Sequence, residues 1–104
     1  PLASDPVLVR LARLKPQDMV NLGYFGHQSP TYGSPFDMLR AAGISYRYAG
    51  ENLAGAPDVD SAHNSLLASP GHRANILNPN YARVGIGVVD GGPYGKIFVQ
   101  LFVG

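Results

Sequence analysis

A chain of 104 residues can build one hydrophobic core but not two, so residues 1–104 are expected to form a single domain. The formal net charge is +1 and the eight basic residues are scattered along the chain, which argues against a nucleic acid as partner. The lack of cysteine excludes disulfide bonds, thiolate metal sites and a cysteine nucleophile, and no stretch has the pattern of a signal peptide or the ~18 apolar residues of a transmembrane helix.

The first half of the chain predicts two helices. Residues 5–22 begin with an aspartate and a proline and continue with apolar residues at helical spacing, which is the pattern of an amphipathic helix. Pro16 lies inside this range, and because proline removes one backbone hydrogen bond we expect it to kink the helix or split it in two. Residues 34–43 have a serine–proline start and a glycine end, which predicts a second, shorter helix.

The second half predicts a strand, a helix, a short turn and a hairpin. Residues 46–54 alternate as a strand does, and residues 57–68 have helical spacing. Residues 69–78 predict a short turn that starts at a serine–proline pair and ends before a proline. Residues 84–103 predict a hairpin whose second strand is apolar on both faces. Such a sheet needs helices on both sides, so the expected fold is an α-β-α sandwich of the α+β class around a small antiparallel sheet.

Three polar residues from separate segments are candidates for chemistry: His27, Glu51 and His72. A carboxylate beside an imidazole fixes the tautomer of the ring and raises its basicity, a relation found in general-base sites and in zinc sites. The three residues are far apart in the sequence, and the chain has no local pair of metal-ligand residues. Two interpretations therefore stay open: a functional cluster, or polar groups that tie loops to the sheet through hydrogen bonds.

Two residues near His72 in the sequence, Ser69 and Asn75, also have both a functional and a structural interpretation. Ser69 precedes a proline at the start of the predicted turn, a serine–proline pair of the kind that begins helices with serine as N-cap, although its hydroxyl is also a candidate nucleophile. Asn75 lies three residues after His72, so on a helix the two share a face. Asn75 is expected either to orient a ligand or to bond a neighbouring loop.

These residues lie in three motifs: Tyr24-Phe-Gly-His27-Gln-Ser-Pro30, Gly50-Glu-Asn-Leu-Ala54 and Ser69-Pro-Gly-His-Arg-Ala-Asn-Ile-Leu-Asn78. Their order and spacing resemble the CAP superfamily, which contains cysteine-rich secretory proteins, antigen 5 and plant pathogenesis-related class 1 proteins. The chain is most similar to the bacterial SCP-like (YkwD-type) branch. The resemblance covers nearly the whole chain, including Asp18-Met19 and Val84-Gly-Ile-Gly-Val88.

The resemblance implies an α-β-α sandwich with a solvent-open cavity. In the family this cavity is lined by two histidines and two acidic residues, and in some members it holds a divalent metal such as zinc. His27, Glu51 and His72 match three of the four positions, and the fourth falls near Ser69. Because the chain has no second glutamate, His27 and His72, with Glu51 nearby, remain as candidate metal ligands. The expected cavity residues are therefore His27, Glu51, Ser69, His72 and Asn75.

The resemblance also bears on the start of the chain. Members of the family usually have a further helix before the position of Pro1, so this domain is expected to lack the family's first helix. Without that helix an apolar strip would be exposed, and we expect association or low stability as its symptom.

Three functions agree with the resemblance, which also implies an extracellular or cell-envelope location. The first is a secreted, non-enzymatic domain that binds a peptide, glycan, apolar ligand or partner protein at the cavity of His27, Glu51 and His72. The second is a hydrolase, for example a peptidase, in which these residues activate water directly or through a metal. The third is a regulatory or structural domain in which the two histidines bind zinc. The missing second glutamate and the lack of a strong nucleophile favour the first function.

Overall fold

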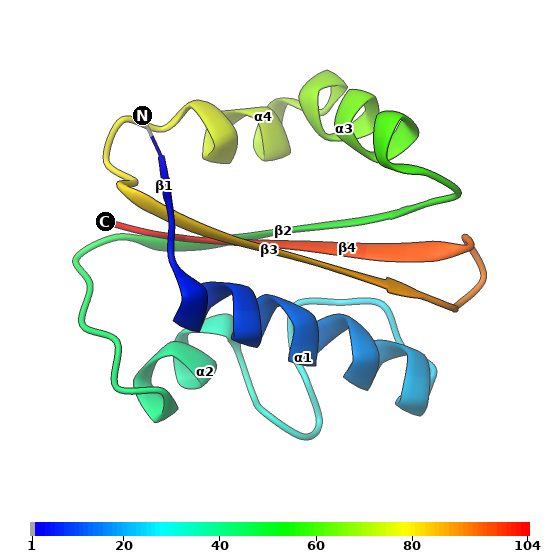
Figure 1. Ribbon diagram of the computed structural model, residues 1–104, viewed down its shortest axis with the longest axis horizontal. Coiled ribbons are helices and arrows are strands. Elements are labelled where there is room, and N and C mark those ends of the chain that lie inside the picture. The colour runs from blue at the N-terminus through cyan, green and yellow to red at the C-terminus, as the bar shows by residue number, and fades with distance from the viewer. Residues whose placement is uncertain (1) are drawn as a thin grey trace.

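The computed structural model describes residues 2–104 and shows four helices and four strands in this part of the chain (Figure 1). Two of these elements were not predicted from the sequence, namely the first, very short strand and the helix that replaces the expected turn at 69–78. In chain order the elements are β1 (Ala3–Ser4), α1 (Pro6–Leu22), α2 (Pro35–Ala41), β2 (Ala49–Ala56), α3 (Val59–Ala68), α4 (Pro70–Leu77), β3 (Arg83–Asp90) and β4 (Lys96–Val103).

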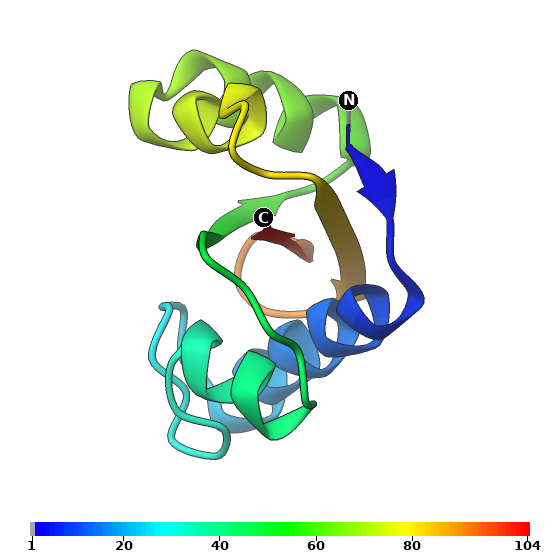
Figure 2. The ribbon, with the colours of Figure 1, turned by 90° about the vertical axis from the view of Figure 1, so that its left-hand side faces the viewer.

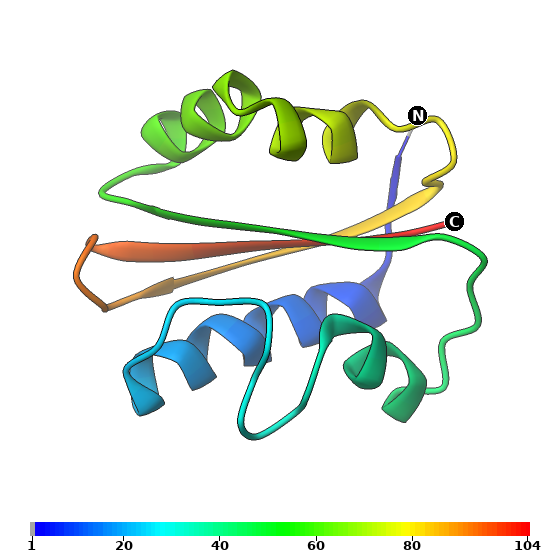
Figure 3. The ribbon, with the colours of Figure 1, turned by 180° about the vertical axis from the view of Figure 1, so that it is seen from behind.

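The four strands form one sheet in the order β1-β3-β4-β2. β4 pairs antiparallel with both β2 and β3, whereas β1 pairs parallel with the start of β3 through two residues. Helices α1 and α2 cover one face of the sheet, and α3 and α4 cover the other, as the views from the side and from behind show (Figures 1, 2 and 3). The predicted α-β-α sandwich of the α+β class is therefore confirmed.

Helix α1 is continuous from Pro6 to Leu22, so of the two effects expected of Pro16, a kink or a split, the split is wrong. The carboxylate of Asp5 caps the helix by accepting hydrogen bonds from the first N–H groups, and Gly23 ends it with a φ of 71°. Buried residues before and after Pro16 pack on the same sheet. This packing outweighs the loss of one backbone hydrogen bond within the helix.

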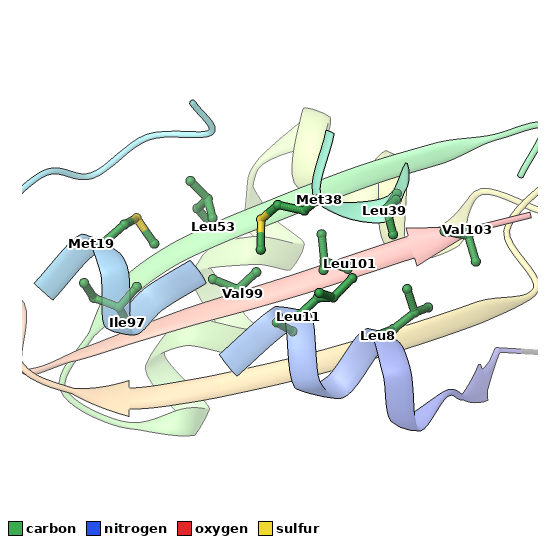
Figure 4. Close-up of a cluster of buried hydrophobic side chains, with 11 residues drawn as sticks. Leu8, Leu11, Met19, Met38, Leu39, Leu53, Ile97, Val99, Leu101 and Val103 are labelled. Carbon is green, nitrogen blue, oxygen red and sulfur yellow. The ribbon is translucent and has the colours of Figure 1, made fainter. Parts of the chain in front are cut away.

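The larger part of the core lies between α1, α2 and the sheet (Figure 4). A smaller apolar cluster lies on the other face, between α3 and the strands. The first cluster contains Leu8, Leu11, Ala12, Met19, Met38, Leu39, Leu53, Ile97, Val99, Leu101 and Val103, and the second contains Ala54, Ala56, Ala62, Leu66 and Phe98.

Successive residues of β2 point to opposite faces of the sheet. Leu53 belongs to the cluster under α1, whereas Ala54 belongs to the cluster under α3. By the same alternation Glu51 points towards α1, and Asn52 points towards α3 and α4. Glu51 and Asn52 are neighbours in the sequence, but their polar side chains therefore lie on opposite faces of the sheet.

Three local predictions need correction. The strand expected at 46–54 is Ala49–Ala56, because the chain reaches β4 only after residue 48. The segment expected as a turn at 69–78 is a helix of eight residues. Ser69 occupies its N-cap position, but its side chain makes no capping hydrogen bond, so the predicted N-cap interaction is wrong.

Two glycines of β3 allow α1 to approach the sheet closely. A Cβ atom placed on Gly85 would lie 2.2 Å from the backbone carbonyl carbon of Leu8. A Cβ atom placed on Gly87 would lie 2.0 Å from the backbone oxygen of Ala12. Since both neighbours are backbone atoms, no side-chain rotation can make room.

Three exposed apolar residues lie on the α3 side of the sheet: Val59 is 63% exposed, Ile86 48% and Val88 41%. They border a hollow of about 150 Å³ between α3 and strands β3 and β4. The apolar strip expected from the lack of the family's first helix, and its effect on association or stability, stay predictions.

The close approach at Gly87 leads to a stability test. We expect Gly87→Ala to lower the free energy of unfolding by about 1–3 kcal/mol, because the added methyl group forces α1 away from β3. Gly71→Ala in α4 is the matched control, since a Cβ atom there meets nothing within 4 Å. It is expected to change stability by no more than about 1 kcal/mol, towards higher stability. Thermal unfolding followed by circular dichroism measures both, and equal melting temperatures for the two variants would contradict the account.

Candidate functional site

Glu51 and His27 form the centre of the site on the α1 side of the sheet. The Nδ1 atom of His27 lies 2.8 Å from Oε1 of Glu51, within hydrogen-bond distance. The side chain of Glu51 is fully buried, whereas 59% of the His27 side chain is exposed. The pair therefore joins an internal carboxylate to an imidazole at the surface.

Lys15 completes this cluster from helix α1. Its side chain is fully buried, its Nζ atom lies 3.8 Å from Oε1 of Glu51, and its ammonium group donates a hydrogen bond to the backbone oxygen of His27. One buried cation thus connects the helix, the edge strand and the loop that carries His27. Lys15 was not among the residues predicted for the site, although it shares the helical spacing of the buried residues Leu8, Leu11 and Met19.

The charges of Lys15 and Glu51 depend on each other. Burial raises the pKa of the Glu51 carboxyl, and the neighbouring Lys15 and His27 oppose this rise. Burial lowers the pKa of the Lys15 ammonium, and the carboxylates of Glu51 and Asp18 oppose this fall. Burial is the larger effect for both groups, so the net pKa of Glu51 is raised and that of Lys15 is lowered, and each partner's charge offsets part of the shift. The second carboxylate oxygen of Glu51, Oε2, is buried and has no hydrogen-bond partner within residues 2–104.

Asp18 fixes the loop on both sides of His27. Its carboxylate accepts hydrogen bonds from Ser29 Oγ at 2.7 Å, from Thr31 Oγ1 at 2.6 Å and from the hydroxyl of Tyr24. Burial alone would raise the pKa of Asp18, but the three hydrogen bonds outweigh it and the net pKa is lowered. Burial and the bond to Asp18 together raise the pKa of Tyr24 to about 12. Two charged side chains of α1, Lys15 and Asp18, therefore hold the loop in place through hydrogen bonds.

An aromatic pair joins the His27 loop, through Phe25, to the turn between β3 and β4, through Tyr94. The rings of Phe25 and Tyr94 meet edge to face with centroids 5.5 Å apart, and both side chains are exposed. The Tyr94 ring lies over Gly55 of β2, where a Cβ atom would come within 2.1 Å of it. Phe25 and Pro93 border an apolar hollow of about 180 Å³.

A second polar cluster lies on the opposite face of β2. Asn52 donates hydrogen bonds to the backbone oxygen of His72 at 3.0 Å and to Oε1 of Gln100 at 3.1 Å. It also accepts a hydrogen bond from Nδ2 of Asn75 at 2.8 Å. Asn52 is buried, so these bonds hold α4 against the sheet. Of the two roles expected for Asn75, the structure shows the bond to a neighbouring element.

The five expected cavity residues are thus divided by the sheet. His27 and Glu51 meet on the α1 face, while Ser69, His72 and Asn75 belong to α4 and its N-cap on the other face. Among residues 2–104, no three histidine, cysteine, aspartate or glutamate side chains come close enough together to hold a metal ion. Lys15 also stands where a metal bound to Glu51 would be repelled. The arrangement of donors does not fit the expected metal site with His27 and His72 as ligands.

The buried ion pair leads to a second stability test. We expect Lys15→Met to lower the free energy of unfolding by about 3–5 kcal/mol, because it leaves the Glu51 carboxylate buried without a cation. In the double variant Lys15→Met/Glu51→Gln neither charge remains, so part of the loss is recovered. Urea unfolding of the two single variants and the double variant gives the coupling energy.

The control for this test is the exposed pair of Lys96 and Asp90. Lys96→Met is expected to cost no more than about 1 kcal/mol, because solvent screens exposed charges. A Lys15→Met variant as stable as Lys96→Met would show that the buried pair does not matter for folding.

Asp18 leads to a pH-dependent prediction. Its pKa in the folded protein lies below the ordinary value of 3.8. The carboxylate's contribution to stability is therefore complete above that value and is lost as the pH falls through the folded pKa. We expect Asp18→Asn to be less stable than the parent by roughly 1–3 kcal/mol at pH 6, with the difference shrinking below about pH 4. Urea unfolding from pH 6 to pH 3 measures it, and a constant difference would contradict the assignment.

Comparisons with known proteins agree with the fold and the motifs. The family model "Cysteine-rich secretory protein family" (CAP) matches residues 1–102. The chain is 50% identical over 105 residues to YkwD of Bacillus subtilis (strain 168), a protein described as uncharacterized; the match covers 100% of this chain and 40% of that protein. The chain therefore spans less than half the length of this relative.

Two solved structures share the architecture. An extracellular protein containing a SCP domain from Bacillus anthracis has a TM-score of 0.86 and 34% identity, over 98% of this chain and 33% of that chain. An outer surface protein of Borrelia burgdorferi has a TM-score of 0.87 over 98% of this chain and 76% of that chain, and at 22% identity it shows likeness of fold only. No helix within residues 2–104 is both long and apolar enough to cross a membrane. On the match of family model, relatives and fold, the chain belongs to the cysteine-rich secretory protein (CAP) family.

Proposed function

We propose that this chain is an extracellular or cell-envelope bacterial binding domain without catalytic activity, and that its ligand or partner surface is centred on His27. The observation that carries the proposal is the fixed and exposed imidazole. Glu51 holds Nδ1 at 2.8 Å, while most of the His27 side chain is open to solvent and its Nε2 atom has no partner among residues 2–104. A side chain that is already held in place loses little freedom when a ligand binds, which favours recognition.

The surroundings of His27 suit a ligand with both polar and flat apolar parts. Phe25, two residues before His27 in the same loop, and Tyr94 of the β3–β4 turn form an exposed aromatic pair. Aromatic rings bury a large apolar area at low cost in side-chain entropy, and the imidazole adds a directional hydrogen bond. Peptides and glycans have both kinds of group, so they are the ligand classes that the proposal names.

The hydroxyl groups near His27 support binding rather than nucleophilic catalysis. Ser29 and Thr31 both donate to Asp18. Within residues 2–104 no serine or threonine hydroxyl is hydrogen-bonded to His27, so a nucleophile activated by this imidazole is missing from the arrangement.

The proposed location rests on the family and on one relative. The Bacillus anthracis protein that matches at 34% identity is described as extracellular. The chain spans 33% of that protein, so its location is carried over to this chain as part of the proposal.

A hydrolase is the second candidate, and one contact favours it. The 2.8 Å pair of Glu51 and His27 is the carboxylate–imidazole relation that makes histidine a better base towards water. Zinc bound by His27 and His72 remains the corresponding metal hypothesis. In the structure His27 pairs with Glu51 on the α1 face of β2, whereas His72 belongs to α4 on the other face.

The main proposal is tested by a matched pair of histidine variants. His63 of α3 is exposed, lies on the other face and makes no side-chain hydrogen bond within the described chain, so His63→Ala is the control for His27→Ala. Peptide and oligosaccharide arrays are probed with the parent and both variants. We expect ligands whose apparent Kd rises at least tenfold, about 1.4 kcal/mol, in His27→Ala and stays unchanged in His63→Ala.

Two further arms separate the alternatives. Hydrolysis of a broad peptide library that is abolished by His27→Ala or Glu51→Gln would replace the binding proposal with the hydrolase. Micromolar zinc binding by calorimetry that is lost in His72→Ala would support the metal hypothesis. Array ligands that respond equally to His27→Ala and His63→Ala would refute a surface centred on His27.

A further inference from the structure

The outer face of α1 carries two arginines without a counter-charge. Arg10 and Arg13 are exposed, and neither forms an ion pair within residues 2–104. The acidic residues with surface partners are already engaged, since Asp5 pairs with Arg83, Asp37 with Arg40 and Asp90 with Lys96. The outer face of α1 therefore has a positive charge that the described chain does not neutralise.

Two hollows lie on either side of these arginines. One, of about 360 Å³, lies between α1 and α2, and the other, of about 440 Å³, lies between α1 and β3. Arg10 and Leu14 line both hollows, so the helix forms a low ridge between them. Their walls include the exposed apolar side chains of Leu14, Tyr32 and Val88.

The two arginines and the two hollows suit a ligand that has both a carboxylate and aliphatic groups. A guanidinium group binds a carboxylate through two parallel hydrogen bonds, and Arg10 and Arg13 are close enough on the helix to act on one acidic side chain. The hollows on either side would accept aliphatic side chains. A helix with its side chains is about 10–12 Å wide, and side chains four residues apart on one face of an extended chain lie about 13 Å apart.

From this match we propose that the outer face of α1 is a docking surface for an extended polypeptide segment of a partner protein. The segment has an acidic residue midway between two aliphatic residues, in the pattern Leu-x-Glu-x-Leu. The acidic side chain meets Arg10 and Arg13, and each aliphatic side chain enters one hollow. A phosphate polymer has no side chains for the hollows, and a flat membrane surface does not fill concave sites, so a polypeptide fits best.

The test uses a library of blocked peptides with a fixed Leu-x-Glu-x-Leu pattern and variable positions between. Fluorescence anisotropy is followed up to about 1 mM protein, a concentration at which weak docking is measurable. We expect members that bind the parent protein and lose at least tenfold in affinity when Glu is replaced by Gln, or in the variant Arg10→Gln/Arg13→Gln. Binding is also expected to weaken as salt is added.

The matched control is Arg47→Gln/Arg73→Gln, which removes the same charge. Arg47 and Arg73 are also exposed and make no ion pair within residues 2–104, but they line neither hollow. This variant should bind the peptides like the parent. Equal losses in the two double variants would show attraction by net charge alone and overturn the proposal.

Other outcomes also overturn it. One is that no peptide of the library binds with a Kd below about 1 mM. Another is that replacing Glu by Gln leaves the affinity unchanged. A third is that the protein binds polyphosphate or anionic phosphatidylglycerol vesicles but not the peptides. Because both arginines are exposed, the variants are expected to keep the parent's melting temperature, and this measurement separates a lost contact from a lost fold.

Discussion

The buried negative charge of Glu51 is the constraint on which the α1 side of the molecule depends. An ionised carboxylate taken out of water costs several kcal/mol unless an opposite charge and hydrogen bonds compensate. Lys15 supplies that charge at 3.8 Å, and its own burial is compensated by this ion pair and by a hydrogen bond to the backbone oxygen of His27. Each buried group thus fixes the next, and strand β2, helix α1 and the His27 loop become one unit. Of the Lys15, Glu51 and His27 side chains, only that of His27 is exposed to solvent.

On the opposite face of β2 the buried polar side chain is neutral, and neutral hydrogen-bonding groups compensate its burial. Asn52 is as deeply buried as Glu51, but its amide is satisfied by Gln100, Asn75 and the backbone of His72. Neighbouring residues of one motif therefore hold two different layers, the α1 layer by charge and the α4 layer by amide hydrogen bonds. This division explains why His72 contributes its backbone to the fold, while His27 presents its ring at the surface.

Sequence patterns predicted the layers of the fold because helical spacing, caps and the apolar second strand of the hairpin are local signals. They also placed His27 and Glu51 in one site through the family motifs. They failed where a result depends on register or packing. Glu51 and Asn52 face opposite layers because side chains alternate along β2, and α4 with His72 packs on the Asn52 side. The continuity of α1 through Pro16 follows from the sheet beneath it. Lys15 was missed because lysine is seldom fully buried, although its helical phase points inward.

Helix α1 connects these features because its two rows of polar residues have separate roles. Lys15 and Asp18 face inward and are fully engaged with Glu51 and the His27 loop, so their replacement must disturb the fold before it alters any surface. Arg10 and Arg13 face outward and engage no other charge within residues 2–104. A change there removes no internal contact. Surface charge on this helix can therefore vary with little effect on stability, whereas the inner row is constrained by the cost of leaving a buried ion unpaired.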